Sequence, residues 1–105
     1  MRNGCGVVSC RMVEKLDETG ISQALERLPG WRREGAEIVR EVKFNTYLDG
    51  AAFVGHVANL AEQMNHHPDI HLGWRKVTLR LSTHSKGGLT AMDFDLAQKI
   101  EALAL

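Results

Sequence analysis

The sequence lacks a net charge, a long apolar run and a cysteine-rich segment, and each absence excludes a class of protein. Thirteen basic and thirteen acidic side chains give a formal net charge of zero, so the composition gives no reason to expect electrostatic binding to nucleic acid or to an anionic membrane. No apolar run approaches the roughly 20 residues that a membrane-spanning helix needs. The first residues contain no apolar segment typical of a signal peptide. We therefore expect a cytoplasmic protein without direct contact to membranes or nucleic acid.

The only two cysteines, Cys5 and Cys10, lie in a glycine-containing leader. Their spacing does not match the two-residue separation of common metal-binding pairs, and a cytoplasmic protein is not expected to keep a disulfide. We interpret residues 1–15 as an irregular leader without a function of its own, in which Met12 is an alternative initiator. Residues 16–105 are too few for two independent cores, so we interpret them as one domain.

Hydrophobic periodicity predicts a helix and then a hairpin in the first half of this domain. Residues 19–28 place apolar side chains at helical spacing, and Pro29 with Gly30 ends that helix. The next run, WRREGAEIVREVKFNTY, predicts two strands with Gly35 between them. Its apolar residues of one parity, which predict one buried face, are Ile38, Val42 and Phe44.

A longer helix is predicted to follow the hairpin. Asp49 is the expected N-cap residue, because its side-chain oxygen can accept a hydrogen bond from the first turn. Pro68 disfavours helical geometry at His67, so the helix should end near His66. The predicted apolar stripe of this helix consists of Phe53, Val57, Leu60, Ala61 and Met64.

The last third of the chain predicts a strand and a final helix. The run RKVTLRLSTH alternates apolar and polar residues, as a half-buried strand does, and Gly87 with Gly88 ends it. Thr90 and Asp93 have the spacing of a capping box, which predicts a helix start. The buried positions expected of this strand and helix are Val77, Leu79, Leu81, Leu96, Ile100 and Leu103. The order of helix, two strands, helix, one or two strands and helix predicts an α+β fold with an antiparallel sheet.

Four of the five histidines fall close together, and they first raise the question of a metal site. Glu62 and His66 are four residues apart, as two ligands on one helix face could be. The neighbours His66 and His67 would point to opposite sides in extended backbone, however, and no H-E-x-x-H motif occurs. A metal site therefore has little support. We interpret His56, in the middle of a helix, and His71, in an expected connecting loop, as surface residues.

Acid–base chemistry is the other functional interpretation of the cluster. Histidine titrates near neutral pH, so two imidazoles can donate one proton and accept another without a metal or a redox cofactor. Glu62, one helical turn from the pair, could orient or charge one of the rings. His84, at the end of the strand-like run, adds a third imidazole.

The pattern of motifs resembles the pterin-4a-carbinolamine dehydratase family. It consists of E-x-x-x-H-H-P, a following aromatic residue (Trp74), K-V-x-L-x-L-S-T-H and G-L-T-x-x-D-x-x-L-A, and the resemblance covers about residues 16–103. It implies a four-stranded antiparallel sheet with three helices packed on one face (α-β-β-α-β-β-α) and a homodimer or homotetramer. It also implies dehydration of 4a-hydroxytetrahydrobiopterin to quinonoid dihydropterin and water, a step that recycles the pterin cofactor of aromatic amino acid hydroxylases.

The resemblance also implies which residues form the site. The implied catalytic residues are His66, His67, His84, Glu62 and Asp93, the two carboxylates being supporting groups. The implied substrate contacts are Asn65, His66, His67, Ser82, Thr83, His84 and Ser85. No cofactor or metal is implied. We expect His66 and His84 to flank the reacting edge of the pterin and His67 to position it.

Two residues depart from the family pattern, and one alternative function stays open. Arg75 follows Trp74 where asparagine is frequent, and Asn65 stands where aspartate is frequent; neither change removes an acid–base group. Members of the family also act as dimerisation partners of a homeodomain transcription factor in animals. The alternative is therefore a non-catalytic, coactivator-type binding protein on the same scaffold. The presence of all three histidines favours the enzyme.

Overall fold

The computed structural model describes residues 15–103. Most of the predicted leader, with both cysteines and Met12, lies outside the described residues. The described elements are α2 (Glu18–Glu26), β1 (Trp31–Glu34), β2 (Glu37–Lys43), α3 (Tyr47–Met64), β3 (Asp69–Leu72), β4 (Lys76–Leu81), the short 3₁₀ helix η1 (His84–Lys86) and α4 (Ala91–Glu101). The expected α-β-β-α-β-β-α order of the long elements is confirmed.

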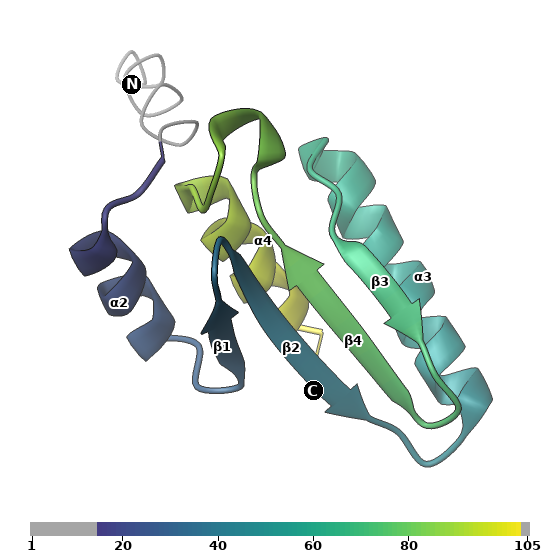
Figure 1. Cartoon of the computed structure of the whole chain (residues 1–105). Helices are drawn as coiled ribbons and strands as arrows, with labels where there is room; N and C mark the ends of the chain where they lie inside the picture. Colours follow the sequence, from purple (N-terminus) through teal and green to yellow (C-terminus); the bar gives the residue numbers. More distant parts are fainter. Residues whose placement is uncertain (1–14, 104–105) are drawn as a thin grey trace.

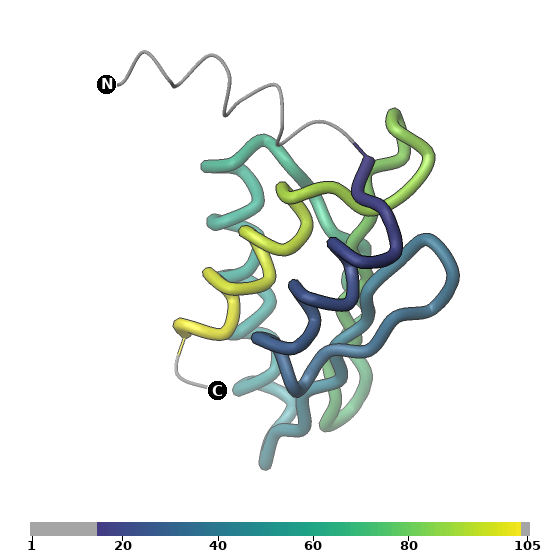
Figure 2. The backbone as a smooth tube through the Cα atoms, turned by 90° about the vertical axis from the view of Figure 1, so that its left-hand side faces the viewer, coloured from purple at the N-terminus to yellow at the C-terminus, as the bar shows by residue number. Residues whose placement is uncertain are grey.

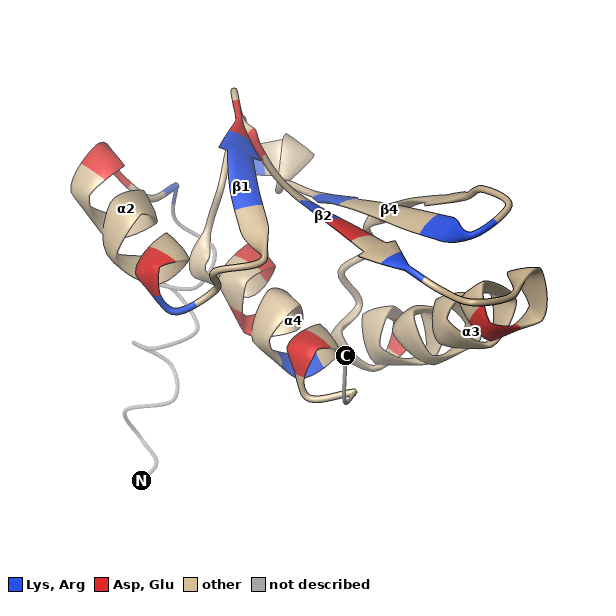
Figure 3. Cartoon of the chain, turned by 90° about the horizontal axis from the view of Figure 1, so that it is seen from below, with Lys and Arg blue, Asp and Glu red and all other residues tan. Residues whose placement is uncertain are grey.

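The four strands form one antiparallel sheet in the order β1-β2-β4-β3. All three long helices cover the same face of this sheet, as Figures 2 and 3 show from two directions. The first hairpin turns at Gly35, whose φ of 59° is a conformation that glycine adopts without strain. The predicted α+β fold with helices on one face is therefore correct.

The hydrophobic core lies between the sheet and the helices. The alternation predicted for β4 is confirmed, because Val77, Leu79 and Leu81 are fully buried. Val57 of α3 and Ile100 of α4 are also fully buried in this cluster. Burying such side chains is the main favourable term in folding, at about 1.5–3 kcal/mol each, so the core fixes how α3 and α4 lie on the sheet.

Helix α3 begins earlier than predicted. The N-cap residue is Thr46, whose hydroxyl accepts a hydrogen bond from the Asp49 amide at 3.1 Å, so the expectation that Asp49 caps the helix is wrong. Asp49 instead lies in the first turn, where its negative charge interacts favourably with the positive end of the helix dipole. The helix ends at Met64, near the predicted position, because Asn65 adopts the left-handed conformation (φ 51°, ψ 43°) that asparagine tolerates better than most residues.

The region after α3 also differs from the sequence-based expectation. His71 lies in the short edge strand β3, opposite Thr78 of β4, and not in a connecting loop. Strand β4 ends at Leu81, before the glycines, and an isolated bridge between Thr83 and Gly88 closes the following loop. His84 therefore begins η1 and does not end a strand.

The sheet face without helices carries ion pairs. Arg80 bonds to Glu34 at 2.9 Å and to Glu37 at 3.1 Å, and Arg32 bonds to Glu34 at 2.7 Å. The Arg80 guanidinium, together with Arg32, holds the pKa of the Glu34 carboxyl below its usual value. Within residues 15–103, no helix is both long enough and apolar enough to cross a membrane.

Candidate active site

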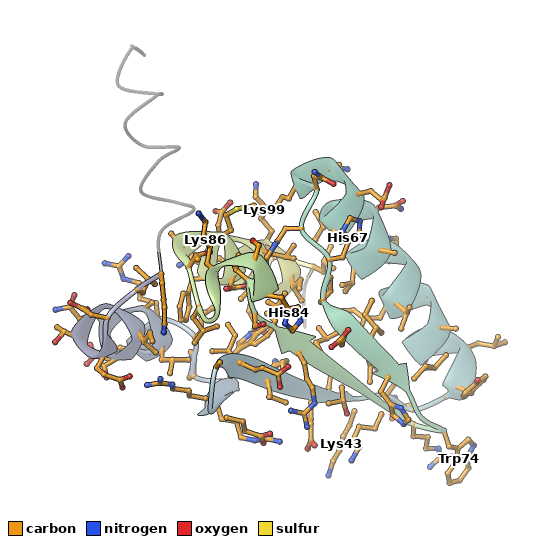
Figure 4. The ribbon with its side chains drawn as sticks, turned by 45° about the horizontal axis from the view of Figure 1, so that its top comes forward. Lys43, His67, Trp74, His84, Lys86 and Lys99 are labelled. Carbon is orange, nitrogen blue, oxygen red and sulfur yellow. The ribbon has the colours of Figure 1, made fainter. Side chains whose placement is uncertain are left out.

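Three chain segments meet at one end of the molecule: the end of α3, the segment between β4 and α4 that contains η1, and the start of α4 (upper end in Figure 1). Hydrogen bonds join all three segments there. Figure 4 shows His67 and His84 at this end and Trp74 at the opposite end. The topology therefore gathers most of the predicted site residues in one place.

His66 and Asp93 form a buried pair across two of these segments. His66 Nε2 lies 2.6 Å from Asp93 Oδ1, although the residues are 27 positions apart in the sequence. The Asp93 side chain is fully buried, and that of His66 is 10% exposed. Burying a carboxylate is costly unless hydrogen bonds compensate for the lost water, so this pair is a specific feature of the fold.

The second oxygen of Asp93 accepts two further hydrogen bonds. Thr83 Oγ1 donates to Asp93 Oδ2 at 2.9 Å, and the Thr90 amide donates to the same oxygen at 2.9 Å. Thr83 Oγ1 also lies 2.9 Å from Thr90 Oγ1, which accepts a hydrogen bond from the Met92 amide. Asp93 is thus part of the capping box of α4, as predicted, and at the same time the partner of His66.

These contacts favour one placement of the hydrogen on His66. An ionised carboxylate only accepts hydrogen bonds, so beside an ionised Asp93 the Nε2 atom of His66 would be the donor. In the neutral imidazole the other nitrogen, Nδ1, then has a free lone pair. Such a ring can take up a proton at Nδ1, and the buried carboxylate would stabilise the imidazolium formed, as the aspartate of a serine-protease triad does.

His67 has a different partner and a different environment. Its Nε2 lies 2.5 Å from Glu62 Oε2, and the two side chains are 53% and 76% exposed. The expectation that Glu62 could orient one of the two rings is confirmed, and the ring is that of His67. Glu62 and His66 do not share a helix face, as the disfavoured metal interpretation would require, because the left-handed Asn65 ends the helix before His66. The expectation that the neighbouring rings of His66 and His67 point in different directions is confirmed by their partners.

The other predicted residues lie on the same chain segments as His66 and Thr83. His84 is exposed at the start of η1, and its ring forms no hydrogen bond within the described part of the chain. Ser82 is half-buried, whereas Asn65 and Ser85 are exposed. Thr83 is 8% exposed, and its hydroxyl bonds inward to Asp93 and Thr90.

Trp74 belongs to the motif but not to this end of the fold. Its side chain is exposed in the turn between β3 and β4, with the Arg75 guanidinium carbon 4.5 Å from the ring centroid. Trp31 is buried and donates a hydrogen bond to Glu101, so it is a core residue.

Neither a metal cluster nor a cavity identifies another reaction centre in the described part of the chain. Residues 15–103 contain no group of three or more histidine, cysteine, aspartate or glutamate side chains placed to hold a metal ion. A cavity of about 730 Å³ lies beside the start of α3, and His56 is among its lining residues. It includes none of the catalytic candidates. We assign the site by its paired acid–base groups, because chemistry requires them and a cavity alone does not supply them.

The sequence analysis implied Thr83 as a substrate contact and Thr90 as a helix cap. It did not predict that their hydroxyls bond to each other or that the Thr83 hydroxyl bonds to Asp93. The capping-box spacing of Thr90 and Asp93 was visible, but the inward direction of Thr83 depends on the loop that follows β4. That direction is a tertiary feature without a sequence signal.

A comparison with protein families identifies one matching family. The family model described as pterin 4 alpha carbinolamine dehydratase matches residues 14–103. A protein of Nocardia farcinica with the provisional name pterin-4-alpha-carbinolamine dehydratase is 50% identical over 91 residues, which cover 87% of this chain and 96% of the relative. A protein of Roseiflexus castenholzii with the same provisional name is 48% identical, covering 88% and 99%.

Two solved structures are similar to this fold. A crystal structure from Brucella melitensis, described as a transcriptional coactivator/pterin dehydratase, has a TM-score of 0.83 and 32% identity, covering 88% of this chain and all of its own. A pterin dehydratase-like protein, described as a RuBisCO assembly factor of the alpha-carboxysome, has a TM-score of 0.57 and 24% identity, covering 70% and 86%. The second similarity shows the fold alone.

Proposed function

The chain belongs to the pterin-4a-carbinolamine dehydratase family, and on that premise we propose that it converts 4a-hydroxytetrahydrobiopterin to quinonoid dihydropterin and water. The observation that carries the proposal is the buried His66–Asp93 pair beside the exposed His67 and His84. The product would return to the pool that serves aromatic amino acid hydroxylases.

The reaction needs two proton transfers and no change in oxidation state. The bond between C4a and the hydroxyl oxygen breaks, and its electron pair leaves with the oxygen, which takes a proton and departs as water. The nitrogen lone pair at N5 forms the new C4a=N5 double bond, and a base removes the N5 proton. One acid and one base therefore suffice, and each typically contributes about 10²–10⁴-fold in rate.

His66 is suited to be the base. Its Nε2 hydrogen is held by Asp93 at 2.6 Å, so Nδ1 would accept the N5 proton. The imidazolium formed would face the buried carboxylate, which favours the charged ring. The His66 side chain is 10% exposed, so part of it reaches the surface, where a substrate could approach.

His84 is suited to be the acid, and His67 to position the substrate. The His84 side chain is exposed on η1, on a different segment from His66, so the two imidazoles can approach one pterin edge from two sides. His67 is oriented by Glu62 and would hold another part of the ring. The proposed further substrate contacts are Asn65, Ser82, Ser85 and the backbone of Thr83.

A rate measurement on the purified protein tests this function. The substrate, 4a-hydroxytetrahydropterin, is generated chemically, and its fast uncatalysed dehydration is subtracted. We expect a rate that rises in proportion to protein concentration and exceeds that of free imidazole at the same histidine concentration. A rate equal to that of free imidazole would show that the fold contributes nothing to the reaction.

A binding role on the same scaffold is the second candidate. The Brucella melitensis relative is described as a coactivator as well as a dehydratase. The exposed large apolar side chains of the described residues are Tyr47, Leu48 and Trp74, at the start of α3 and in the β3–β4 turn. Such side chains would suit a contact with a second copy or another protein. This role would not require the His66–Asp93 pair.

A further inference from the structure

We propose that the hydroxyl groups of Thr83 and Thr90 form a relay that orients the Asp93 carboxylate and, through it, the His66 imidazole. Both threonines would then be positioning residues of the site. The catalytic consequence rests on the proposed dehydratase function, but the orientation of His66 can be measured independently of activity.

The relay follows from counting hydrogens. Each hydroxyl has one hydrogen, and Thr83 Oγ1 donates its hydrogen to Asp93 Oδ2. The 2.9 Å contact between the two hydroxyls then requires Thr90 to donate to Thr83. Thr90 Oγ1 in turn accepts from the Met92 amide. Each hydrogen thus forms one hydrogen bond: the Met92 amide donates to Thr90, Thr90 donates to Thr83, and Thr83 donates to the Asp93 carboxylate.

The environment makes this relay a fixed structure. Thr90 and Asp93 are fully buried and Thr83 is 8% exposed, so water has little access to replace a lost hydroxyl. With its two oxygens bonded on opposite sides, by His66 on Oδ1 and by Thr83 and the Thr90 amide on Oδ2, the carboxylate cannot rotate. The plane of the carboxylate then sets the direction of the His66 Nε2–H bond.

Helix capping alone does not account for Thr83. The capping box of α4 is complete with Thr90 and Asp93, because Thr90 Oγ1 accepts an amide and Asp93 Oδ2 accepts the Thr90 amide. The backbone of Thr83 already pairs with Gly88. Its hydroxyl is therefore required by neither the helix nor the loop, and its partners within the described residues are the other relay members.

Removing the Thr83 hydroxyl should affect turnover more than substrate affinity. We expect Thr83→Val to lower kcat about tenfold or more, the effect of losing one hydrogen bond to a charged group. KM should stay close to the wild-type value, because the hydroxyl bonds to the buried Asp93 and Thr90 side chains. Thr83→Ser keeps the hydroxyl and should restore kcat. If Thr83 instead contacted the substrate through its side chain, KM would rise.

The matched control is Thr78→Val. Thr78 lies on β4, on the sheet face without helices, so the same hydroxyl is removed outside the relay. We expect wild-type kcat and KM for this variant. An equal loss of kcat in both valine variants would mean that removing any threonine hydroxyl near the sheet lowers turnover, and this result would overturn the proposal.

The decisive measurement is nitrogen-15 NMR of the histidine side chains. In the wild-type protein His66 should carry its hydrogen on Nε2, and this hydrogen should exchange slowly with solvent. The signal should persist in Thr83→Ser and Thr78→Val and should broaden or disappear in Thr83→Val. Hydrogen on Nδ1 in the wild type, or an unchanged signal together with unchanged kcat in Thr83→Val, would overturn the relay.

These readouts separate the relay from the function it supports. A wild-type protein without dehydratase activity but with the Nε2 signal and its loss in Thr83→Val would contradict the proposed function and keep the relay. If Thr83→Val does not fold, Thr83→Ala removes the same hydroxyl with less bulk. The wild-type tautomer can refute the relay without any variant.

Discussion

Asp93→Asn is the substitution that tests the geometry of the site most selectively. Asparagine has the shape of aspartate but exchanges one acceptor oxygen for an amide nitrogen that only donates. The Thr90 amide and the Thr83 hydroxyl both donate to Oδ2 at 2.9 Å, so the amide oxygen of the new residue should take that place. The amide nitrogen would then face His66 Nε2, which lies 2.6 Å from the oxygen it replaces.

The opposite orientation of the amide is unfavourable. It would place the amide nitrogen against the Thr90 amide and leave a buried donor unsatisfied, at a cost of about 1–3 kcal/mol. His66 in Asp93→Asn must therefore accept at Nε2 and carry its hydrogen on Nδ1. That nitrogen could no longer act as the base. The equivalent substitution in a serine-protease triad lowers turnover by about 10⁴ through the same change of tautomer.

We expect Asp93→Asn to lower kcat by roughly 10²–10⁴ and to lower stability by only about 1–2 kcal/mol, because neutral hydrogen bonds replace charge-assisted ones while the helix cap remains. Steady-state kinetics and chemical denaturation measure the two effects. Asp95→Asn, on the same helix and without a hydrogen bond or ion pair within the described residues, is the control and should behave as wild type. Turnover of folded Asp93→Asn within about threefold of wild type would refute the assignment of His66 as the base.

Three further predictions concern affinity, metals and assembly. His67→Ala should raise KM more than it lowers kcat, because positioning acts on the bound substrate and the transition state alike; steady-state kinetics will show the split, and an unchanged KM would contradict it. Treatment with a chelator should leave activity unchanged, and activity that is lost and then restored by one metal would reverse the preference for acid–base chemistry. Light scattering should find a homodimer or homotetramer at micromolar concentration, as the family resemblance implies, and a monomer would count against it.

The sequence predicted those parts of the fold that depend on local periodicity. Alternation located β4, and helical spacing located α2, α3 and α4. Edge strand β3 was not found by alternation, because four residues with two half-buried side chains give a weak pattern. The strand forms because it pairs with β4, a contact that its own four residues do not predict. The N-cap was misplaced by three residues because Thr46 and Asp49 are both good capping residues, and only the backbone path of the β2–α3 loop decides between them.

The sequence named residues of the candidate site but not their pairing. The motif resemblance implied His66, His67, Glu62 and Asp93, and the spacing left open which of the two rings Glu62 would contact. A single left-handed residue, Asn65, ends the helix before the two histidines. His67 then contacts Glu62, and His66 contacts Asp93. Partners separated by 27 residues depend on how α4 packs, which no local pattern contains.

The central claim is that the imidazoles of His66 and His84 carry the two proton transfers. Its most direct test is the steady-state kcat of His66→Ala, His84→Ala and the double variant on chemically generated substrate, with the uncatalysed reaction subtracted. His66→Gln accompanies them, because its amide can still donate to the buried Asp93 but cannot take up a proton. The account predicts that each single variant loses about ten- to a thousandfold in kcat and that the double variant loses far less than the product of the two. Wild-type turnover in folded His66→Gln and His84→Ala would contradict it, and the binding role would then be preferred.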